Sequence, residues 1–186
     1  MTTTEVLNER RTLRKHLLHQ RRQIDLQQRQ RWDQSLIDHL LAWCEEEKPA
    51  SLAVYSPIQC EPDVGGCYSK ISAMGIQIAF PLVVAKEMPL QFLAWREGDP
   101  MTKDDFGIPV PLQRDHFVIP EVLLIPCVGF NSRNYRLGYG GGFYDRTLSQ
   151  LPSAISIGIA YQNQHCEFEP GIHDVAMTKI LTESSS

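Results

Sequence analysis

The chain has 186 residues, of which 42% are hydrophobic and 22% are charged, and its formal net charge is -4. This composition is typical of a globular protein, and the length is enough for one domain with a sizeable core. The mildly acidic balance argues against a chain built to coat nucleic acid, and no apolar run is long enough to span a bilayer.

The N-terminal residues predict neither an exported nor a membrane-anchored protein. They contain no apolar segment followed by a small-residue cleavage site, so we expect no secretory signal. The number of cysteines is odd and there is no CxxC pair, which favours free thiols in a reducing compartment. Cys60 and Cys67 could share a metal, although their spacing matches no common zinc pattern. We therefore expect a cytoplasmic protein. We also expect it to have no nucleic-acid or membrane partners and to be a monomer, although no sequence feature specifies the oligomeric state.

Residues 1–47 predict two helices. Four apolar side chains of the first helix share one stripe at helical spacing: Val6, Leu13, Leu17 and Ile24. Asp25 is a suitable N-cap for the second helix. The apolar face of that second helix is expected to consist of Leu36, Ile37, Leu40, Leu41 and Trp43.

Basic residues accompany the stripe of the first helix. Arg10, Arg14 and Arg21 lie close beside it on a helical wheel. Three others lie farther round, toward solvent: Arg11, Lys15 and Arg22. Arg10 and Arg14 could lean over the sheet toward a ligand or belong to a solvated basic face, and the pattern leaves both interpretations open. An RNA-binding arm is a further alternative, but no aromatic stacking residues are interleaved.

After Pro49 the pattern changes to strands. Six runs have strand character: residues 51–56, 75–81, 90–95, 122–130, 154–161 and 178–183. Helices fit between some of them, at residues 64–74 and 144–150. The alternation predicts a single α/β domain over residues 1–186, with a mostly parallel central sheet flanked by helices in three layers and the N-terminal helices packed on the sheet. Residues 107–120 are expected to form an irregular connection, and residues 183–186 a disordered tail.

A glycine-rich loop follows the strand at residues 122–130. Four of the five residues 138–142 are glycines, and a helix is predicted directly afterwards. Such a loop at a helix N-terminus can direct several N–H groups at an anion. Arg136 would add a cation with forked donors, and Asp145 could hold a magnesium ion that bridges phosphates. The loop, including Arg136, is expected to be exposed when no ligand is bound.

Familiar phosphate-binding and nucleophile patterns are not met. No Lys-Ser or Lys-Thr completes a P-loop, Phe143 stands where GxGxxG requires its last glycine, and there is no GxSxG elbow. The alternative is a tight turn that needs left-handed residues. Four glycines flanked by an arginine and an aspartate exceed what a turn requires.

At this loop the sequence resembles a known family. The segment "PCVGFNSRNYRLGYGGGFYDRTL", residues 126–148, is similar to the signature of the 5-formyltetrahydrofolate cyclo-ligases, also called methenyltetrahydrofolate synthetases. That signature runs roughly P-x-x-x-F-D, a short variable stretch, then R-L-G-x-G-x-G-Y-Y-D. Other segments match in the same order along nearly the whole chain: "RRTLR", "YSPIQCEPD", "FGIPVP" and "HDVAMTKILTE".

The resemblance implies ATP-dependent closure of 5-formyltetrahydrofolate to 5,10-methenyltetrahydrofolate, with release of ADP and phosphate. A formyl amide is a poor electrophile, and phosphorylation of its oxygen creates a leaving group that the neighbouring anilino nitrogen can displace. The protein then has to align two substrates and neutralise phosphates rather than supply a nucleophile. A relative that binds nucleotide or folate without turnover is the alternative.

The resemblance also implies site residues. Arg136 and Tyr144 are expected to be catalytic, and Asp145 and Asp174 to hold Mg²⁺. The expected ATP-binding residues are Arg10, Arg14, Arg136, Leu137, Gly138, Tyr139, Gly140, Gly141, Gly142, Phe143 and Tyr144. The expected folate-binding residues are Ser56, Glu61, Phe106, Tyr139, Gly140, Gly141, Gly142 and Phe143. A carboxylate such as that of Glu61 can accept paired hydrogen bonds from the amino and ring N–H groups of a pterin.

Each of these residues also has an ordinary structural interpretation. Glu61 could start a turn before its proline, Asp174 could be a cap or a solvated loop residue, and Asp145 could be a first-turn acid. The aromatic residues of the loop could serve packing alone.

Three positions depart from the family pattern. Asn131 stands where an aspartate is usual, Arg10 replaces a lysine, and Val110 stands where a polar or acidic residue is common. Arginine keeps the charge of lysine but not its geometry. These departures bear on the affinity for the folate more than on nucleotide binding.

Overall fold

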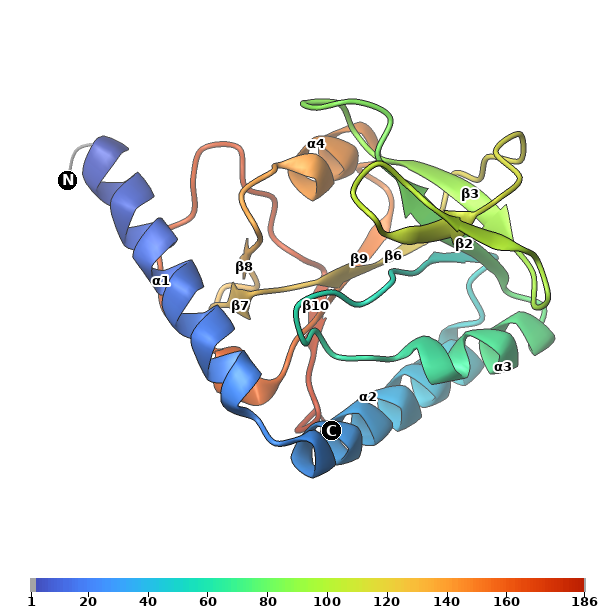
Figure 1. Cartoon of the computed structure of the whole chain (residues 1–186), viewed down its shortest axis with the longest axis horizontal. Coiled ribbons are helices and arrows are strands. Elements are labelled where there is room, and N and C mark those ends of the chain that lie inside the picture. The colour runs from blue at the N-terminus through green and yellow to red at the C-terminus, as the bar shows by residue number, and fades with distance from the viewer. Residues whose placement is uncertain (1–2, 186) are drawn as a thin grey trace.

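Six strands form the central sheet of the computed structural model, which describes the backbone of residues 3–185 and the side chains of residues 8–185 (Figure 1). Their order across the sheet is β10-β9-β6-β1-β2-β3. The strands are β1 Ser51–Ala53, β2 Gln77–Leu82, β3 Gln91–Trp95, β6 Val122–Pro126, β9 Ile155–Ile159 and β10 Lys179–Leu181. All pairs are parallel except β2 with β3, so the predicted mostly parallel sheet is confirmed.

Alternate residues of each strand face opposite layers. Leu52 and Val54 belong to a core cluster on one face of the sheet, whereas Ala53 belongs to a cluster on the other. The first face is covered by α2 (Leu26–Glu47), η1 (Gly65–Cys67) and α3 (Tyr68–Ala73). The second is covered by α4 (Phe143–Gln150) and by the segment around Met177. The result is the predicted three-layer arrangement, because both faces of a mostly parallel sheet have to be buried.

The two N-terminal helices pack in different places. Helix α2 lies on the sheet and begins as predicted at its N-cap Asp25, whose carboxylate accepts a hydrogen bond from the Gln28 N–H at 2.9 Å. Helix α1 (Thr3–Gln23) lies apart from α2 at one side of the molecule, beside β7 and β8 (Figure 1). Its Leu17 packs with Val128 and Leu137 rather than on the sheet. The side chain of Val6, also predicted for this stripe, lies outside the described side chains.

The apolar run at residues 122–130 is not one strand, as the sequence predicted. Strand β6 ends at Pro126, and the chain then leaves the sheet. Two short strands, β7 (Gly129–Phe130) and β8 (Arg136–Leu137), pair as a separate antiparallel hairpin. This hairpin carries the chain from the sheet to the glycine loop.

Two further expectations need correction. Residues 107–120 are not wholly irregular, because β5 (Pro109–Pro111) pairs with β4 (Met101–Lys103) as a small antiparallel sheet. The tail is not disordered over residues 183–185, since the Ser185 hydroxyl accepts a hydrogen bond from the Thr182 N–H at 2.9 Å. Ser186 lies outside the described residues.

Candidate functional site

A cavity of about 660 Å³ opens at the carboxyl ends of β1 and β6. The chain continues from β1 to β2 on one side and later returns to β6 on the other, so these two strands border a topological switch point, where α/β sheets bind their ligands. Ser56, just beyond β1, and Pro126, at the end of β6, both line the cavity. Its volume is within the range of ligand-binding sites.

The cavity collects nearly all of the residues predicted from the sequence. Those that line it are Arg10, Arg14, Ser56, Glu61, Phe106, Arg136, Gly138, Tyr139, Gly140, Gly141, Gly142, Phe143, Tyr144, Asp145 and Asp174. Leu137 is different, because its side chain is fully buried with Leu17 and Val128 and contributes nothing to the lining. Leu137 therefore anchors the hairpin by its packing and does not line the cavity.

The glycine loop has the open backbone that the sequence predicted. Gly140 and Gly142 adopt φ angles of 96° and 67°, a left-handed region that disfavours other residues. Gly142 is the N-cap of α4 and provides no side-chain hydrogen bond to the first turn of that helix. The N–H groups there are consequently not capped by a side chain, and the helix dipole favours an anion beside them.

Arg14 ties helix α1 to this loop. Its Nε donates a hydrogen bond to the Gly138 carbonyl at 2.7 Å, and its guanidinium lies about 4 Å from where a Cβ on Gly140 would stand. Burial and the neighbouring charge of Arg10 both lower the pKa of Arg14. Because two guanidinium ions repel each other here, an anion placed between them and the loop would relieve the repulsion.

Each predicted metal ligand forms an ion pair with an arginine of the same cavity. Arg136 donates to Asp145 at 2.7 Å, and Arg10 donates to Asp174 at 2.8 Å. Only 5% of the Arg136 side chain is exposed, so the expectation that this residue is exposed without ligand was wrong. The loop itself is exposed from Tyr139 to Gly141, as expected.

The two carboxylates fit a magnesium ion that takes most of its ligands from water and substrate phosphates. One oxygen of each aspartate accepts the arginine, and the other accepts no hydrogen bond from the described residues. Within residues 8–185, no three His, Cys, Asp or Glu side chains form a ready-made metal site. Magnesium usually takes one or two carboxylates together with water and substrate phosphates, and Asp145 and Asp174 match that pattern.

At the other end of the cavity lies a buried carboxylate. Glu61 is only 4% exposed; its Oε2 accepts the Ile58 N–H at 2.8 Å, and its Oε1 accepts the Tyr139 hydroxyl at 2.8 Å. Burial raises the pKa of Glu61, while these two hydrogen bonds and the charge of Arg21 lower it in part. Glu61 therefore belongs to the site rather than to a simple surface turn.

Aromatic residues form the walls between the two ends. Phe106 is 56% exposed, and its ring stands edge-on to Phe143 at 6.5 Å between centroids. The ring of Tyr144 lies 6.0 Å from the Arg136 guanidinium, and burial raises the pKa of Tyr144, so this phenol can donate a hydrogen bond but cannot act as a base at neutral pH. Ser56 donates its hydroxyl to the Pro109 carbonyl at 3.1 Å.

The departures from the family pattern have local structural explanations. Asn131 is buried away from the cavity and closes the β7–β8 hairpin; its Oδ1 accepts two backbone N–H groups, and its Nδ2 donates to the Phe168 carbonyl at 3.1 Å. An aspartate could not make that last bond. Val110 is fully buried and does not line the cavity. Arg10 places its charge on Asp174.

The sequence interpretation missed several residues of the site, including three charged ones. Arg21, placed beside the apolar stripe, is fully buried and donates to Tyr139 at 2.6 Å. Arg146 holds the loop by donating to the Gly141 carbonyl at 2.7 Å. Asp104 lines the cavity and accepts the N–H groups of the turn that carries Phe106. Only Arg21 gave a signal, as a cation beside an apolar stripe.

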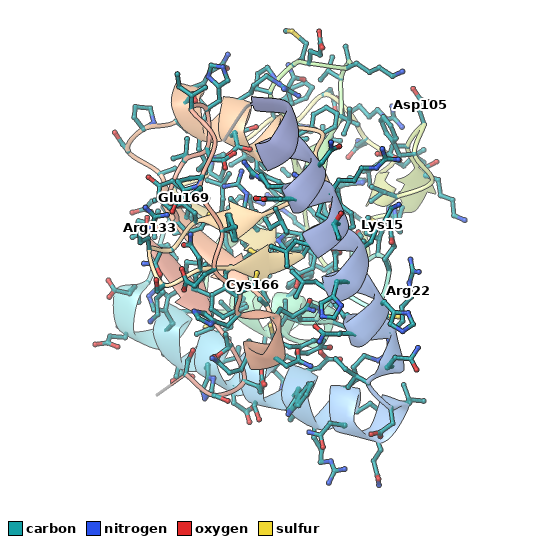
Figure 2. All side chains as sticks on the ribbon, turned by 90° about the vertical axis from the view of Figure 1, so that its left-hand side faces the viewer. Lys15, Arg22, Asp105, Arg133, Cys166 and Glu169 are labelled. Atoms are coloured by element: carbon teal, nitrogen blue, oxygen red, sulfur yellow. The ribbon has the colours of Figure 1, made fainter. Side chains whose placement is uncertain are left out.

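The basic residues predicted to face solvent do so. Arg11, Lys15 and Arg22 are exposed, and Figure 2 shows Lys15 and Arg22 along the side of α1 opposite Cys166. The five cysteines form no disulfide. Among the described residues, no helix has the length and apolar character needed to cross a membrane.

Comparisons with known proteins agree on one family. The model of the "5-formyltetrahydrofolate cyclo-ligase family" matches residues 6–183. A 5-formyltetrahydrofolate cyclo-ligase from Haemophilus influenzae is 34% identical over 84% of this chain and 87% of its own length. One from Mycoplasma pneumoniae is 31% identical over 94% of this chain and 99% of its own length.

Solved structures agree as well. A 5,10-methenyltetrahydrofolate synthetase from Mycoplasma pneumoniae superposes with a TM-score of 0.79 at 28% identity, covering 94% of this chain and 99% of that one. The enzyme of that name from Aquifex aeolicus gives a TM-score of 0.83 at 25% identity, covering 95% and 90%. Together with the cavity and its residues, these matches lead to one conclusion: this chain belongs to the 5-formyltetrahydrofolate cyclo-ligase family.

Proposed function

We propose that the protein converts 5-formyltetrahydrofolate and ATP to 5,10-methenyltetrahydrofolate, ADP and phosphate. The observation that carries the proposal is that one cavity joins an open glycine loop, three arginines and a buried carboxylate in a member of this family. The loop and the arginines suit a triphosphate, and the carboxylate suits the N–H edge of a pterin.

The reaction needs activation of an amide oxygen. The formyl oxygen attacks the γ-phosphorus of ATP, ADP leaves, and the anilino nitrogen attacks the activated carbon. The new C–N bond closes the ring, the carbon–oxygen bond breaks, and the anilino proton leaves with the departing phosphate as hydrogen phosphate. No protein nucleophile is required, because alignment and charge neutralisation lower the barrier.

We call the part of the cavity formed by the glycine loop with Arg10, Arg14 and Arg136 the phosphate end. The three arginines are expected to have different roles there. Arg14 is fixed to the loop by its bond to the Gly138 carbonyl, which leaves the rest of its guanidinium fork for phosphate oxygens. Arg10 and Arg136 can exchange their aspartate partners for phosphate, since both partners are anions of similar reach. Arg136 and Tyr144, side by side in the cavity, would neutralise charge and donate a hydrogen bond at the transferred group.

Asp145 and Asp174 would hold Mg²⁺ through the oxygens that the arginines leave free. A magnesium ion held by these two residues would supply positive charge against the negative charge that develops on the phosphates. The release of Arg10 and Arg136 toward phosphate would free both carboxylates at the same time. Nucleotide and metal are therefore expected to bind together rather than separately.

At the folate end, Glu61 would accept the pterin amino and ring N–H groups. Phe106 and Phe143 would pack on the rings, and Ser56 lines the same region. We propose that the protein acts as a monomer. The free cysteines support a reducing compartment such as the cytoplasm.

The decisive experiment is turnover by the purified protein. With ATP and Mg²⁺, 5-formyltetrahydrofolate should give a product that absorbs in the near ultraviolet, and no product should form without ATP. A folded protein that gives no product at micromolar enzyme would contradict the proposal. Nucleotide or folate binding by calorimetry without product would instead support a non-catalytic relative.

A further inference from the structure

Arg21 is a fully buried arginine for which the proposed reaction has no direct use. Its guanidinium donates four hydrogen bonds within the described part of the chain, and all four acceptors are neutral: the carbonyls of Gln59 and Cys127, the amide oxygen of Gln164 and the hydroxyl of Tyr139. A buried charge held without a carboxylate partner is costly to keep. Such a residue calls for a functional explanation.

The hydrogen bond from Arg21 to Tyr139 connects the buried guanidinium to Glu61. The Tyr139 hydroxyl accepts from Arg21 at 2.6 Å and lies 2.8 Å from Glu61 Oε1. Arginine has donors only, so the single phenolic proton must point at Glu61. Each bond polarises the next, which strengthens both in a buried site.

The surroundings of Glu61 make the charge of Arg21 important for the ionisation of this carboxyl group. Burial raises the pKa of Glu61, and the hydrogen bonds from Ile58 and Tyr139 and the charge of Arg21 oppose that effect. The other ionisable groups that interact with Glu61 are three: Tyr55 after β1, Cys127 after β6 and Tyr144 of α4. Burial raises the pKa of each of these three, so they are neutral at neutral pH. Arg21 is the one cation that supports the ionised form of Glu61 among the described residues.

The two fixed bonds leave Glu61 able to bind more. Oε1 accepts Tyr139 and Oε2 accepts Ile58, and each carboxylate oxygen has a second acceptor position. A pterin edge can therefore be added without displacing either partner. Tyr139 also stands between Gly138 and Gly140, so the same contact holds the loop against the folate end of the cavity.

We propose that Arg21 and Tyr139 are positioning residues for the folate, which hold the carboxylate of Glu61 in its charged form and in one orientation toward the pterin. This inference depends on the proposed role of Glu61.

The test is Tyr139→Phe, which removes one hydroxyl from a residue that is 38% exposed and so leaves the fold intact. The Kd for 5-formyltetrahydrofolate, measured by calorimetry without nucleotide, should rise about tenfold. The KM for the folate should rise in parallel, with a much smaller change in the KM for ATP. Because a lowering influence on the pKa of Glu61 is lost, the fall of folate affinity on acidification should begin at higher pH.

Two further variants make the result interpretable. Tyr135→Phe removes a hydroxyl in the neighbouring hairpin, outside the cavity, and should change neither affinity nor pH profile. Arg21→Lys keeps the charge but loses the fork, so a folded variant should shift the pH profile in the same direction as Tyr139→Phe but by less. Should Arg21→Lys fail to fold, the Tyr139→Phe result decides alone.

Glu61→Gln separates this inference from the proposed function. Suppose that Glu61→Gln loses folate affinity, whereas Tyr139→Phe keeps its Kd for the folate within about twofold and keeps the same pH profile. That result would overturn the positioning role alone. Tighter folate binding by Tyr139→Phe would also overturn it, since Tyr139 would then obstruct the site. Unchanged folate affinity in Glu61→Gln would instead refute the folate contact on which the inference rests.

Discussion

The two ends of the cavity hold their arginines in different ways. At the phosphate end, Arg10 and Arg136 each face an aspartate across less than 3 Å. At the folate end, Arg21 is bonded to neutral oxygens only, one of which belongs to Tyr139. A carboxylate can be exchanged for a phosphate with little change in charge, whereas neutral acceptors have no such competitor. The comparison indicates that the phosphate end is built for exchange of partners and the folate end for a fixed orientation.

The largest effect is expected from Arg136→Ala, which leaves Asp145 without its partner. Breaking a largely buried pair should cost about 3 kcal/mol of stability and lower the Tm by about 10 °C. Loss of a donor to the transferred phosphate should lower kcat/KM for ATP by at least about 100-fold. Thermal unfolding and steady-state kinetics measure the two effects separately.

An exposed pair provides the matched control. Arg133 and Glu169 form an ion pair at 3.0 Å with side chains 50% and 78% exposed (Figure 2). Arg133→Ala should leave both stability and activity unaltered, because an ion pair in solvent contributes little. Equal losses in the two variants would show that burial does not distinguish the pairs, contrary to this account.

Gly140→Val should act on the phosphate end alone. Its Cβ would enter the space beneath the Arg14 guanidinium, at a left-handed φ of 96°. We expect kcat/KM for ATP to fall about 100-fold, because a small displacement of the phosphates is enough to lose alignment. The Kd for the folate should change little.

Gly98→Val is the control, because it introduces the same backbone strain at a position outside the cavity. Gly98 has a φ of 90°, no atom within 4 Å of the position that a Cβ would take, and no place in the cavity lining. The activity of this variant should match that of the unmodified protein. A comparable loss of activity in Gly98→Val would attribute the Gly140 effect to strain rather than to blocked phosphates.

Asp174→Asn tests the exchange of partners. The variant keeps a hydrogen-bond acceptor for Arg10 but loses a charge, so the Mg²⁺ concentration for half-maximal ATP binding should rise about tenfold. Calorimetric titrations of ATP at several Mg²⁺ concentrations measure this shift. An unchanged Mg²⁺ requirement would remove Asp174 from the metal site.

The smallest effect concerns stability and pH at the folate end. Burial raises the pKa of Glu61 above its ordinary value of 4.5, so the folded protein binds this proton more tightly than the unfolded chain does. The contribution of the Glu61 carboxyl group to the free energy of unfolding is fully present below pH 4.5 and is lost as the pH rises through the pKa of the folded state. Compared with Glu61→Gln, the unmodified protein should lose stability across that window, as measured by denaturant unfolding. A difference in unfolding free energy between the two proteins that does not change with pH would contradict a raised pKa of Glu61.

The layers of the fold could be predicted from the sequence because they depend on local pattern, whereas most of the cavity residues, such as Glu61 and Asp174, were predicted only through the resemblance to the family. Strand-length apolar runs indicated the sheet, and the glycine loop with Arg136 and Asp145 predicted an anion site. The break after β6 was missed, although Pro126 inside the run gave a signal for it, since a proline cannot donate to the sheet.

The pairing of side chains could not be predicted in the same way. Arg10 and Asp174 are far apart in the chain, and the four acceptors of Arg21 come from four separate segments. An arginine at the edge of an apolar stripe is ordinarily solvated, so its complete burial follows only from the folded arrangement of those segments. Long-range polar networks of this kind require the structure.

The central claim is that the glycine loop holds the triphosphate while Arg10 and Arg136 turn from their aspartates to its oxygens. A crystal structure with a non-hydrolysable ATP analogue and Mg²⁺ tests it most directly. The account predicts phosphates against Gly140 to Gly142, the metal on Asp145 and Asp174, and the Arg21–Tyr139–Glu61 contacts unchanged. A triphosphate bound elsewhere, with the loop empty and both ion pairs intact, would contradict it.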